Sequence, residues 1–246
     1  MKYTEIYHFH HPHHKLRFEN SETPFKCDGC KEVGIGSCYK CCSTICDYDL
    51  HMQCALPSPT LFHPFYRKCN FQFMSQPAGN TPRYCNACEK DVNGFVYHCR
   101  SCGYDLHPCC AKLPMVLDDD GEVKLYLYRK VRSSWCHHCG RKGGSWSYRS
   151  KCKSYNLHVA CVREMIMENW QHIYGGGGRT HHDGDVVIHG LKKSMESSAV
   201  HKRNKGKKVK KRCCEIAAMA LQIVISALLG DPTPLIATTV ASLMSN

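Results

Sequence analysis

The chain has 246 residues, of which 20 are cysteine and 17 are histidine, and its formal net charge is +12. It opens MKYTEIYHFHHPHH, without the charged leader, apolar core and cleavage site of a secretory signal. We therefore expect an intracellular protein, cytoplasmic or nuclear, and we do not expect a secreted disulfide framework. In a reducing compartment, this many thiols indicate metal binding.

One motif occurs three times along the chain. Tyr48–Pro57, Tyr104–Pro114 and Tyr155–Glu164 each contain Tyr-Asp/Asn-Leu-His-x2-Cys. A Cys-x2-Cys pair, eight further residues and a tyrosine precede each copy, which gives the repeat Cys-x2-Cys-x8-Tyr-x(9–11)-His-x2-Cys. Four cysteine and histidine donors at such spacing suit tetrahedral zinc, and a filled set of four indicates a structural site.

We predict one such set, the main site, in each repeat. The main site of repeat one consists of Cys27, Cys30, His51 and Cys54. That of repeat two consists of Cys85, Cys88, His107 and Cys110, and that of repeat three of Cys136, Cys139, His158 and Cys161.

Repeat one carries donors for a second site between its main-site residues. Cys46 is one, and the other is Cys41, which the register with the repeated tyrosine favours, or Cys42, which the spacing favours. Outside the repeat, His14 and His63 would complete this second site.

Repeat two has a matching set in Cys99 and Cys102, with Cys69 at the position of the earlier histidine. Its fourth ligand is left open, because Asp119 at the corresponding position lies in an aspartate run typical of a solvated turn. In repeat three the inner positions are Ser150 and Lys153, so we expect a single site there. The prediction for the whole chain is about five zinc ions.

The motifs HPHHKL (11–16), PFKCDGC (24–30), CDYDLHMQCA (46–55) and CGYDLHPCCAKLP (102–114) resemble a known family. They are similar to the zinc-binding C1 domain of diacylglycerol-regulated kinases, and more closely to its divergent plant relative, the cysteine/histidine-rich domain family. The resemblance covers residues 8–172. It implies two cross-braced zinc ions in a complete unit, a small twisted antiparallel sheet with a short helix near its end, and a role in intracellular signalling during stress or defence.

The expected fold is a small metal-bound α+β structure of three tandem C1-like units. Residues 94–100 and 124–131 are aromatic and β-branched, as strands are, and 158–174 has apolar residues at helical spacing. The boundaries that we expect are 8–63, 64–119 and 120–174 for the units, 175–212 for a glycine-rich and then basic linker, and 213–246 for an apolar helical tail.

The tail combines a basic run with apolar residues. Lys202–Arg212 holds eight basic residues and no acid, Cys213 and Cys214 follow, and the apolar stretches 215–230 and 234–244 come next. The first stretch is too short to span a bilayer. The order suits a peripheral anchor on an anionic membrane, self-association or a partner helix, or nuclear import and nucleic-acid contact. The residues leave these three alternatives open.

Diacylglycerol is not an expected ligand. Ten residues separate Cys30 from Cys41, and ten separate Cys88 from Cys99. This loop is longer in the diacylglycerol-responsive relatives, where it carries a Gln-Gly pair that is missing here.

The leading functional hypothesis is a non-enzymatic zinc-binding adaptor with protein partners. One alternative is thiol–disulfide chemistry like that of a protein-disulfide reductase, and another is a nucleic-acid-binding regulator. The basic and aromatic residues of repeat three that suggest the latter are Arg129, Lys130, Arg132, Trp135, Arg141, Lys142, Trp146 and Arg149. Four aromatic residues without a ligand role, Phe25, Phe95, Trp135 and Trp146, are candidates for a contact surface, although packing over a zinc site is favoured for the first two.

Overall fold

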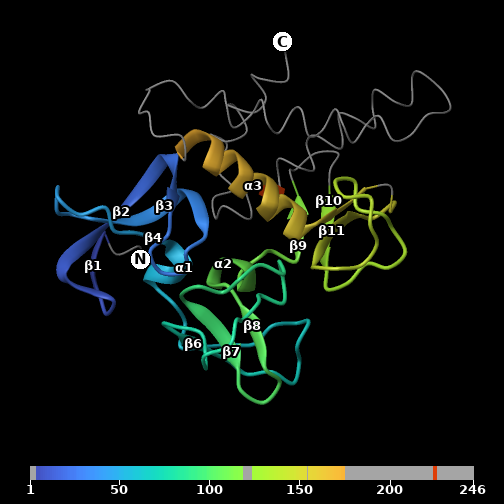
Figure 1. Cartoon of the computed structure of the whole chain (residues 1–246), viewed down its shortest axis with the longest axis horizontal. Coiled ribbons are helices and arrows are strands. Elements are labelled where there is room, and N and C mark those ends of the chain that lie inside the picture. Colours follow the sequence, from blue (N-terminus) through green and yellow to red (C-terminus); the bar gives the residue numbers. More distant parts are fainter. Residues whose placement is uncertain (1–3, 119–123, 154, 175–223, 226–246) are drawn as a thin grey trace, which may run out of the picture. The chain divides into compact units, whose positions relative to one another are not determined.

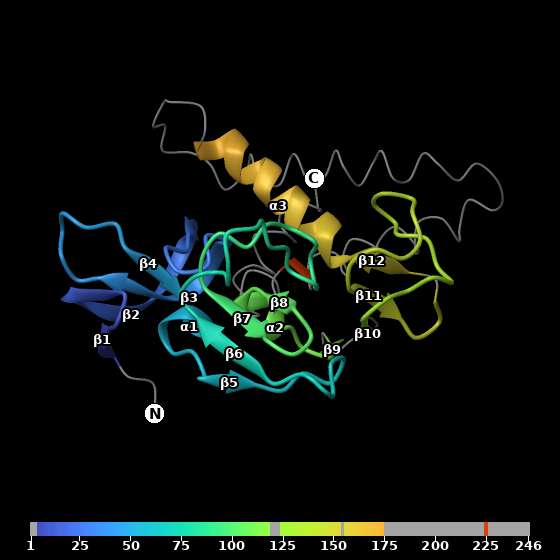
Figure 2. The same ribbon diagram turned by 60° about the horizontal axis from the view of Figure 1, so that its bottom comes forward.

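The computed structural model describes residues 4–118, 124–153, 155–174 and 224–225, and these form three four-stranded antiparallel sheets (Figure 1, Figure 2). Consecutive strands are neighbours in each sheet, and the last strand leads directly into a helix. The first sheet has β1 (Glu5–His8), β2 (His11–Lys26), β3 (Val33–Cys41) and β4 (Asp49–His51), followed by α1 (Met52–Ala55). The second has β5 (Thr60–Leu61), β6 (Phe71–Met74), β7 (Val96–Cys99) and β8 (Tyr104–Leu106), followed by α2 (Pro108–Ala111). The third has β9 (Val116–Asp118), β10 (Lys124–Tyr128), β11 (Ser147–Ser150) and β12 (Asn156–His158), followed by α3 (Val159–Tyr174).

The elements predicted from local pattern are present. β7 lies inside the predicted strand 94–100, β10 begins the predicted strand 124–131, and α3 fills almost all of the predicted helix. The sheets begin earlier than the expected boundaries at 64 and 120, because β5 pairs with β6 and β9 pairs with β10. These edge strands are two and three residues long, too short to leave a pattern in the sequence.

The repeated tyrosine and leucine form the centre of each sheet. Tyr39 lies opposite Leu50, Tyr97 opposite Leu106 and Tyr148 opposite Leu157, and all six side chains are buried. The hydroxyl of Tyr97 donates a hydrogen bond to the Ser58 carbonyl (2.9 Å), and that of Tyr148 donates to the Pro114 carbonyl (2.8 Å). The leucine that pairs with the tyrosine directly precedes the ligating histidine in every repeat, so one strand pair serves the core and the metal ligands together.

The Cys-x2-Cys turn has one conformation in all three repeats. The residue after the second cysteine has a positive φ in repeats one and two, 66° at Lys31 and 60° at Glu89, and Gly140 takes this conformation in repeat three with 63°. The amide of each of these residues donates to the carbonyl of the first cysteine, at 2.7–2.9 Å. The turn thus brings two thiols to the same side of the backbone.

A pair of hydrogen bonds ties each turn to the last strand. The amide of Asp28 donates to the Asp49 carbonyl, that of Asn86 to Asp105 and that of His137 to Asn156, each at 2.8 Å. In return the side chains of Asp28, Asn86 and His137 accept from the amides of Asp49, Asp105 and Asn156, at 2.9, 2.8 and 3.2 Å. Three chemically different side chains make the same contact, so the geometry is a property of the repeat.

The third sheet gains apolar packing from its long helix. Trp146 is fully buried, as are Val159 and Val162 of α3, and Met165 is almost so. Trp146 is therefore a core residue, and of the four aromatic candidates only Trp135 is exposed, at 61%. Phe25 is buried with its ring 5.3 Å from that of His51, which confirms its packing beside a main site.

The described residues up to Leu113 form one unit and those from Pro114 form a second. In the first unit, the second sheet packs against the Cys-x2-Cys turn of repeat one: the amide of Phe95 donates to the Gly29 carbonyl (2.9 Å). The Phe95 ring lies against Gly29, and a β-carbon at Gly94 would collide with the Gly29 carbonyl oxygen. Glycine at both positions allows this close approach of the two backbones.

The linker and most of the tail, 175–223 and 226–246, lie outside the described residues, so the predictions for them stay predictions. Val224 and Ile225 are helical, and Val224 is fully buried. Among the helices that the structure describes, none combines the length and apolar character needed to cross a bilayer.

We expect Leu106→Ala to lower the free energy of unfolding by about 2–5 kcal/mol, because it removes a fully buried side chain from the centre of the second sheet. Urea unfolding of the zinc-loaded protein measures this. Leu56→Ala, at a position 43% exposed, is the control and should change stability by less than about 0.5 kcal/mol. Equal losses for the two variants would contradict this packing.

Candidate metal centres

The structure brings together the four side chains of each predicted main site. In every repeat, the Cys-x2-Cys turn supplies two thiols and the helix supplies the last cysteine. The histidine ends the last strand in repeats one and three, and it directly follows that strand in repeat two. The ligand atoms of each set lie within 4.8 Å of one another. The sets are Cys27, Cys30, His51 and Cys54; Cys85, Cys88, His107 and Cys110; and Cys136, Cys139, His158 and Cys161.

The distances within these sets suit a tetrahedral ion. The histidine Nδ1 lies 3.4 Å from Sγ of Cys30, Cys88 and Cys139 in the three repeats. Sγ of Cys110 and Cys161 lie 3.9 and 3.7 Å from the same histidine atoms. Zinc with donors at 2.0–2.3 Å would set its ligands about 3.5–3.8 Å apart. The donor sets therefore fit zinc, with Nδ1 of each histidine as the ligand atom.

Each main site favours negative charge on one of its sulfur atoms, that of the first cysteine of the Cys-x2-Cys pair. Burial raises the pKa of the Cys85 thiol, but hydrogen bonds from Cys110 and Cys88 and the charge of His107 outweigh burial and hold it well below its usual value. Burial lowers the pKa of His107, but the charges of Cys85 and Cys88 raise it well above its usual value. A metal cation between these groups would displace the extra proton of the imidazole, because a ligating histidine must be neutral.

Repeat one contributes a carboxylate to the main site of repeat two. His107 Nε2 donates to the Asp91 carbonyl (2.9 Å), and Oε1 of Glu32 lies 3.4 Å from the same nitrogen. Glu32 follows the Cys-x2-Cys turn of repeat one, and its side chain is largely covered. A carboxylate behind a ligating imidazole orients the ring and increases its basicity.

Cys109 adds a fifth thiol near these two main sites. It is 5% exposed, and its thiol is hydrogen-bonded with those of Cys30 in repeat one and Cys110 in repeat two. The corresponding residues are Gln53 and Ala160 in the other repeats. The contact therefore belongs to the packing of repeat two on repeat one.

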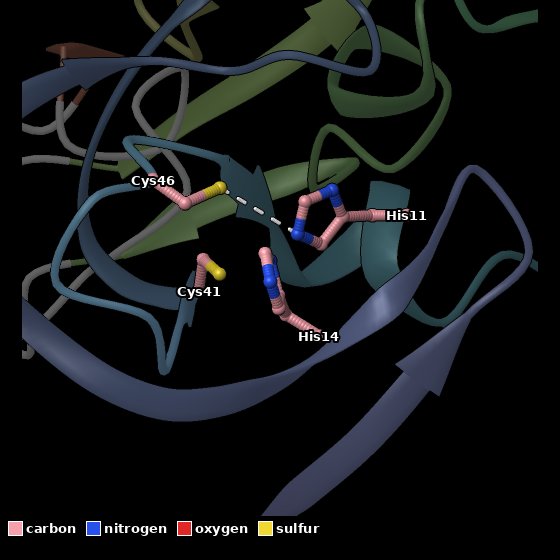
Figure 3. Close-up of side chains that lie close together, drawn as sticks. All are labelled: His11, His14, Cys41 and Cys46. Atoms are coloured by element: carbon pink, nitrogen blue, oxygen red, sulfur yellow. Dashed lines mark hydrogen bonds between the residues drawn. The ribbon is translucent and has the colours of Figure 1, made fainter.

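A further set of four donors lies at the first sheet, where Figure 3 shows two imidazoles facing two thiols. The set consists of His11, His14, Cys41 and Cys46, and its ligand atoms lie within 4.8 Å of one another. Cys46 Sγ is 3.6 Å from His11 Nε2, and the buried His14 Nδ1 has no hydrogen-bond partner among the residues that the structure describes. A metal ion would satisfy donors grouped in this way.

The set resolves the alternative between the two adjacent cysteines. β2 pairs with β3 so that Leu16 lies opposite Cys41, which places Cys41 next to His14. Cys42 is exposed, and it is absent from every donor group found among the described residues.

His63 is not in this set, and His11 occupies the place that the sequence assigned to it. His63 is buried elsewhere: its Nδ1 accepts from the Phe65 amide (3.2 Å), and burial lowers its pKa to about 4. The β1–β2 hairpin instead brings in His11, which stacks on Tyr48 with ring centroids 4.3 Å apart. The spacing His11-x2-His14, which mirrors the Cys-x2-Cys pairs, was the available signal in the sequence.

Repeat two places three donors together at the corresponding position. Cys69, Cys99 and Cys102 have their sulfur atoms within 4.8 Å of one another, and Cys102 is exposed. Burial raises the pKa of Cys99, but hydrogen bonds from Ser101 and Cys102 outweigh it and bring it to about 7. Asp119, the open candidate for a fourth ligand, lies outside the described residues.

In repeat three, hydrogen bonds of Ser150 lie at the position where repeat two has its second cluster of cysteines. The Ser150 hydroxyl accepts from the Tyr155 amide (3.0 Å) and from the Cys152 thiol (3.3 Å). Ser150 therefore closes the turn that Cys99 and Cys102 form in repeat two. Within the part of repeat three that the structure describes, the main site is the one group of metal-type donors.

Comparison with known families supports this geometry. The family model of the C1 domain matches residues 9–55 and 63–111, which contain the first two main sites. Neither the search of curated proteins nor the search of solved structures returned a match. Two segments of the chain thus match the C1 domain, and the donor clusters of the chain fit the zinc sites of such domains.

We expect His11→Ala to reduce the zinc content by one ion, because the second site of repeat one would lose one of its four donors. Native mass spectrometry of the protein purified with zinc measures the count. His63→Ala is the matched variant and should retain every ion. A full count in the first variant together with a loss in the second would restore His63 as the ligand.

We expect Glu32→Gln to weaken zinc binding at the main site of repeat two about tenfold, because the imidazole of His107 loses a carboxylate behind it. One ion should then leave at a correspondingly lower concentration of a competing chelator. The control is Glu19→Gln, at an exposed position in β2. Identical release profiles for the two variants would show that Glu32 does not influence the metal.

Proposed function

We propose that this protein, with its two C1-like segments, is a non-enzymatic zinc-stabilised interaction module that serves as an adaptor in intracellular signalling. The observation that carries the proposal is the use of the cysteine pairs. In the described residues, four of the five Cys-x2-Cys pairs contribute both thiols to a donor cluster with other cysteines or histidines, and the fifth contributes Cys41 but not the buried Cys38. Closed clusters of four protein ligands suit a structural role for the metal.

We propose further that repeat three is a third C1-like unit. Its sheet has the strand order of the other two, its Tyr148–Leu157 pair occupies the same register, and its Cys-x2-Cys turn has the same hydrogen bonds. These features support three units in tandem. With two ions in each of the first two units and one in the third, the protein would bind five zinc ions.

The metal would supply stability that the small cores lack. Units of this size bury too little apolar surface to offset chain entropy without help. Structural zinc contributes on the order of 10 kcal/mol in small finger peptides. Protein partners would then bind to surfaces that the zinc sites hold in place.

Removal of zinc should unfold the described units. We expect a strong chelator to abolish the far-ultraviolet circular dichroism of the sheets and readdition of zinc to restore it, and native mass spectrometry should count five ions in the loaded protein. The control is the same chelator saturated with zinc. A protein that keeps its spectrum after complete removal of zinc would refute the proposal.

The redox alternative receives a separate test. A disulfide reductase uses a Cys-x-x-Cys pair with a reactive thiolate, usually on a βαβ scaffold, whereas the described sheets here are antiparallel. Dithiothreitol reduces insulin slowly by itself, and we expect the zinc-loaded protein not to increase that rate. Thioredoxin, which should increase it, is the positive control. Catalytic turnover that survives zinc loading would favour the reductase.

A further inference from the structure

The positive charge of the described chain is concentrated in repeat three. Residues 4–113 contain eleven lysines and arginines and ten acidic residues, so they are almost neutral. Residues 124–163 contain ten lysines and arginines and no aspartate or glutamate. Asp118, which forms an ion pair with Lys124, and Glu164 flank this stretch, but its net charge remains strongly positive, so it attracts polyanions.

Most of these cations are on the surface. Arg163 is buried and Arg149 is partly covered, while the other eight are exposed. The eight exposed residues are Lys124, Arg129, Lys130, Arg132, Arg141, Lys142, Lys151 and Lys153.

Two loops that carry these residues are held against each other. The loop 129–135 leaves β10, and the loop 140–144 follows the Cys-x2-Cys turn. The Gly143 amide donates to the Val131 carbonyl (2.7 Å), and the Cys136 amide donates to the Arg141 carbonyl (2.8 Å). The main site of repeat three therefore anchors both loops, and we call their exposed residues the basic surface.

Aromatic rings lie among these cations. The Lys142 Nζ is 4.5 Å from the centre of the Trp135 ring, which remains 61% exposed. Arg149 lies over the Tyr128 ring at 4.4 Å and donates to the Ser133 hydroxyl (3.1 Å). An exposed ring with a cation on one face can stack a base on the other, and the neighbouring cations can contact the phosphates.

We propose that the basic surface of repeat three binds single-stranded nucleic acid. The proposal rests on the interaction module proposed above and names the class of its partner. Unstacked bases would pack on Trp135, and the exposed cations of the two loops would contact the phosphates on either side.

The composition of the surface favours a nucleic acid over a membrane. A loop that inserts into a bilayer presents apolar side chains at its tip. Among the described residues of 124–163, Trp135 is the one large apolar side chain that is exposed, and Val131 in the same loop is buried. Cations with an isolated aromatic ring match the needs of a single strand.

The test measures binding of the full-length, zinc-loaded protein to a fluorescein-labelled oligothymidylate by fluorescence anisotropy over a range of salt concentrations. The variant Arg132→Gln/Arg141→Gln/Lys142→Gln should lose at least about tenfold in affinity, and the slope of log K against log salt should fall by about 2, at 0.7 for each lost phosphate contact. The matched control Arg67→Gln/Arg100→Gln/Lys112→Gln changes the same residue types at exposed positions of the first unit and should retain both values.

Trp135→Ala tests the stacking separately. It should reduce affinity roughly fivefold or more without changing the salt slope, because the ring makes no ionic contact with the strand. Circular dichroism and zinc content of every variant verify folding. A wild-type protein that lacks zinc would refute the proposed module, whereas a zinc-loaded protein that does not bind the strand would refute this inference alone.

Two further outcomes would overturn the inference. Equal losses of affinity in the two triple variants would show that binding depends on the net charge of the protein and not on the basic surface. Binding of phosphatidylserine vesicles that depends on Trp135 and the three cations, with no effect of these residues on oligothymidylate, would assign the surface to anionic lipid.

Discussion

The convergence of two thiols from a Cys-x2-Cys turn with a histidine and a cysteine from the end of the sheet is the interaction on which each repeat depends. The turn is hydrogen-bonded to the last strand on both sides, so the four donors are placed by backbone geometry. The tyrosine–leucine pair packs one residue away from the ligating histidine. Core and donor cluster therefore form one structural unit in each repeat.

The three repeats use this arrangement for different ends. The first two pack together so closely that Glu32 of repeat one stands behind a histidine of repeat two, and Cys109 of repeat two reaches a cysteine of repeat one. In repeat three, the hydrogen bonds of Ser150 lie where repeat two has its second donor cluster, and a 16-residue helix contributes side chains to the core. The loops on either side of its Cys-x2-Cys turn carry exposed cations, which we propose as a contact surface.

Sequence patterns predicted most of the fold and most of the donors. The fixed spacing specified all twelve main-site residues, because ligands on a turn and at a strand end must recur at fixed intervals. The helix of repeat three and the strands β7 and β10 were also apparent from their patterns. The short edge strands β5 and β9 were missed, because two or three residues carry no periodicity.

The sequence by itself determined the repeat, the donor types and the basic character of the third segment. Only the tertiary structure decided which residues group with Cys41 and Cys46 in repeat one. His11 precedes the repeat and His63 follows it, both at plausible distances, and the β1–β2 hairpin brings His11 into the cluster. The tertiary structure likewise decided that Cys41 faces the cluster while Cys42 is exposed, and that Trp135 is exposed while Trp146 is buried. These choices depend on strand register, which places Cys41 opposite Leu16 at the end of β3, and on how the loops that carry Cys42 and the two tryptophans pack, and neither can be read from local sequence.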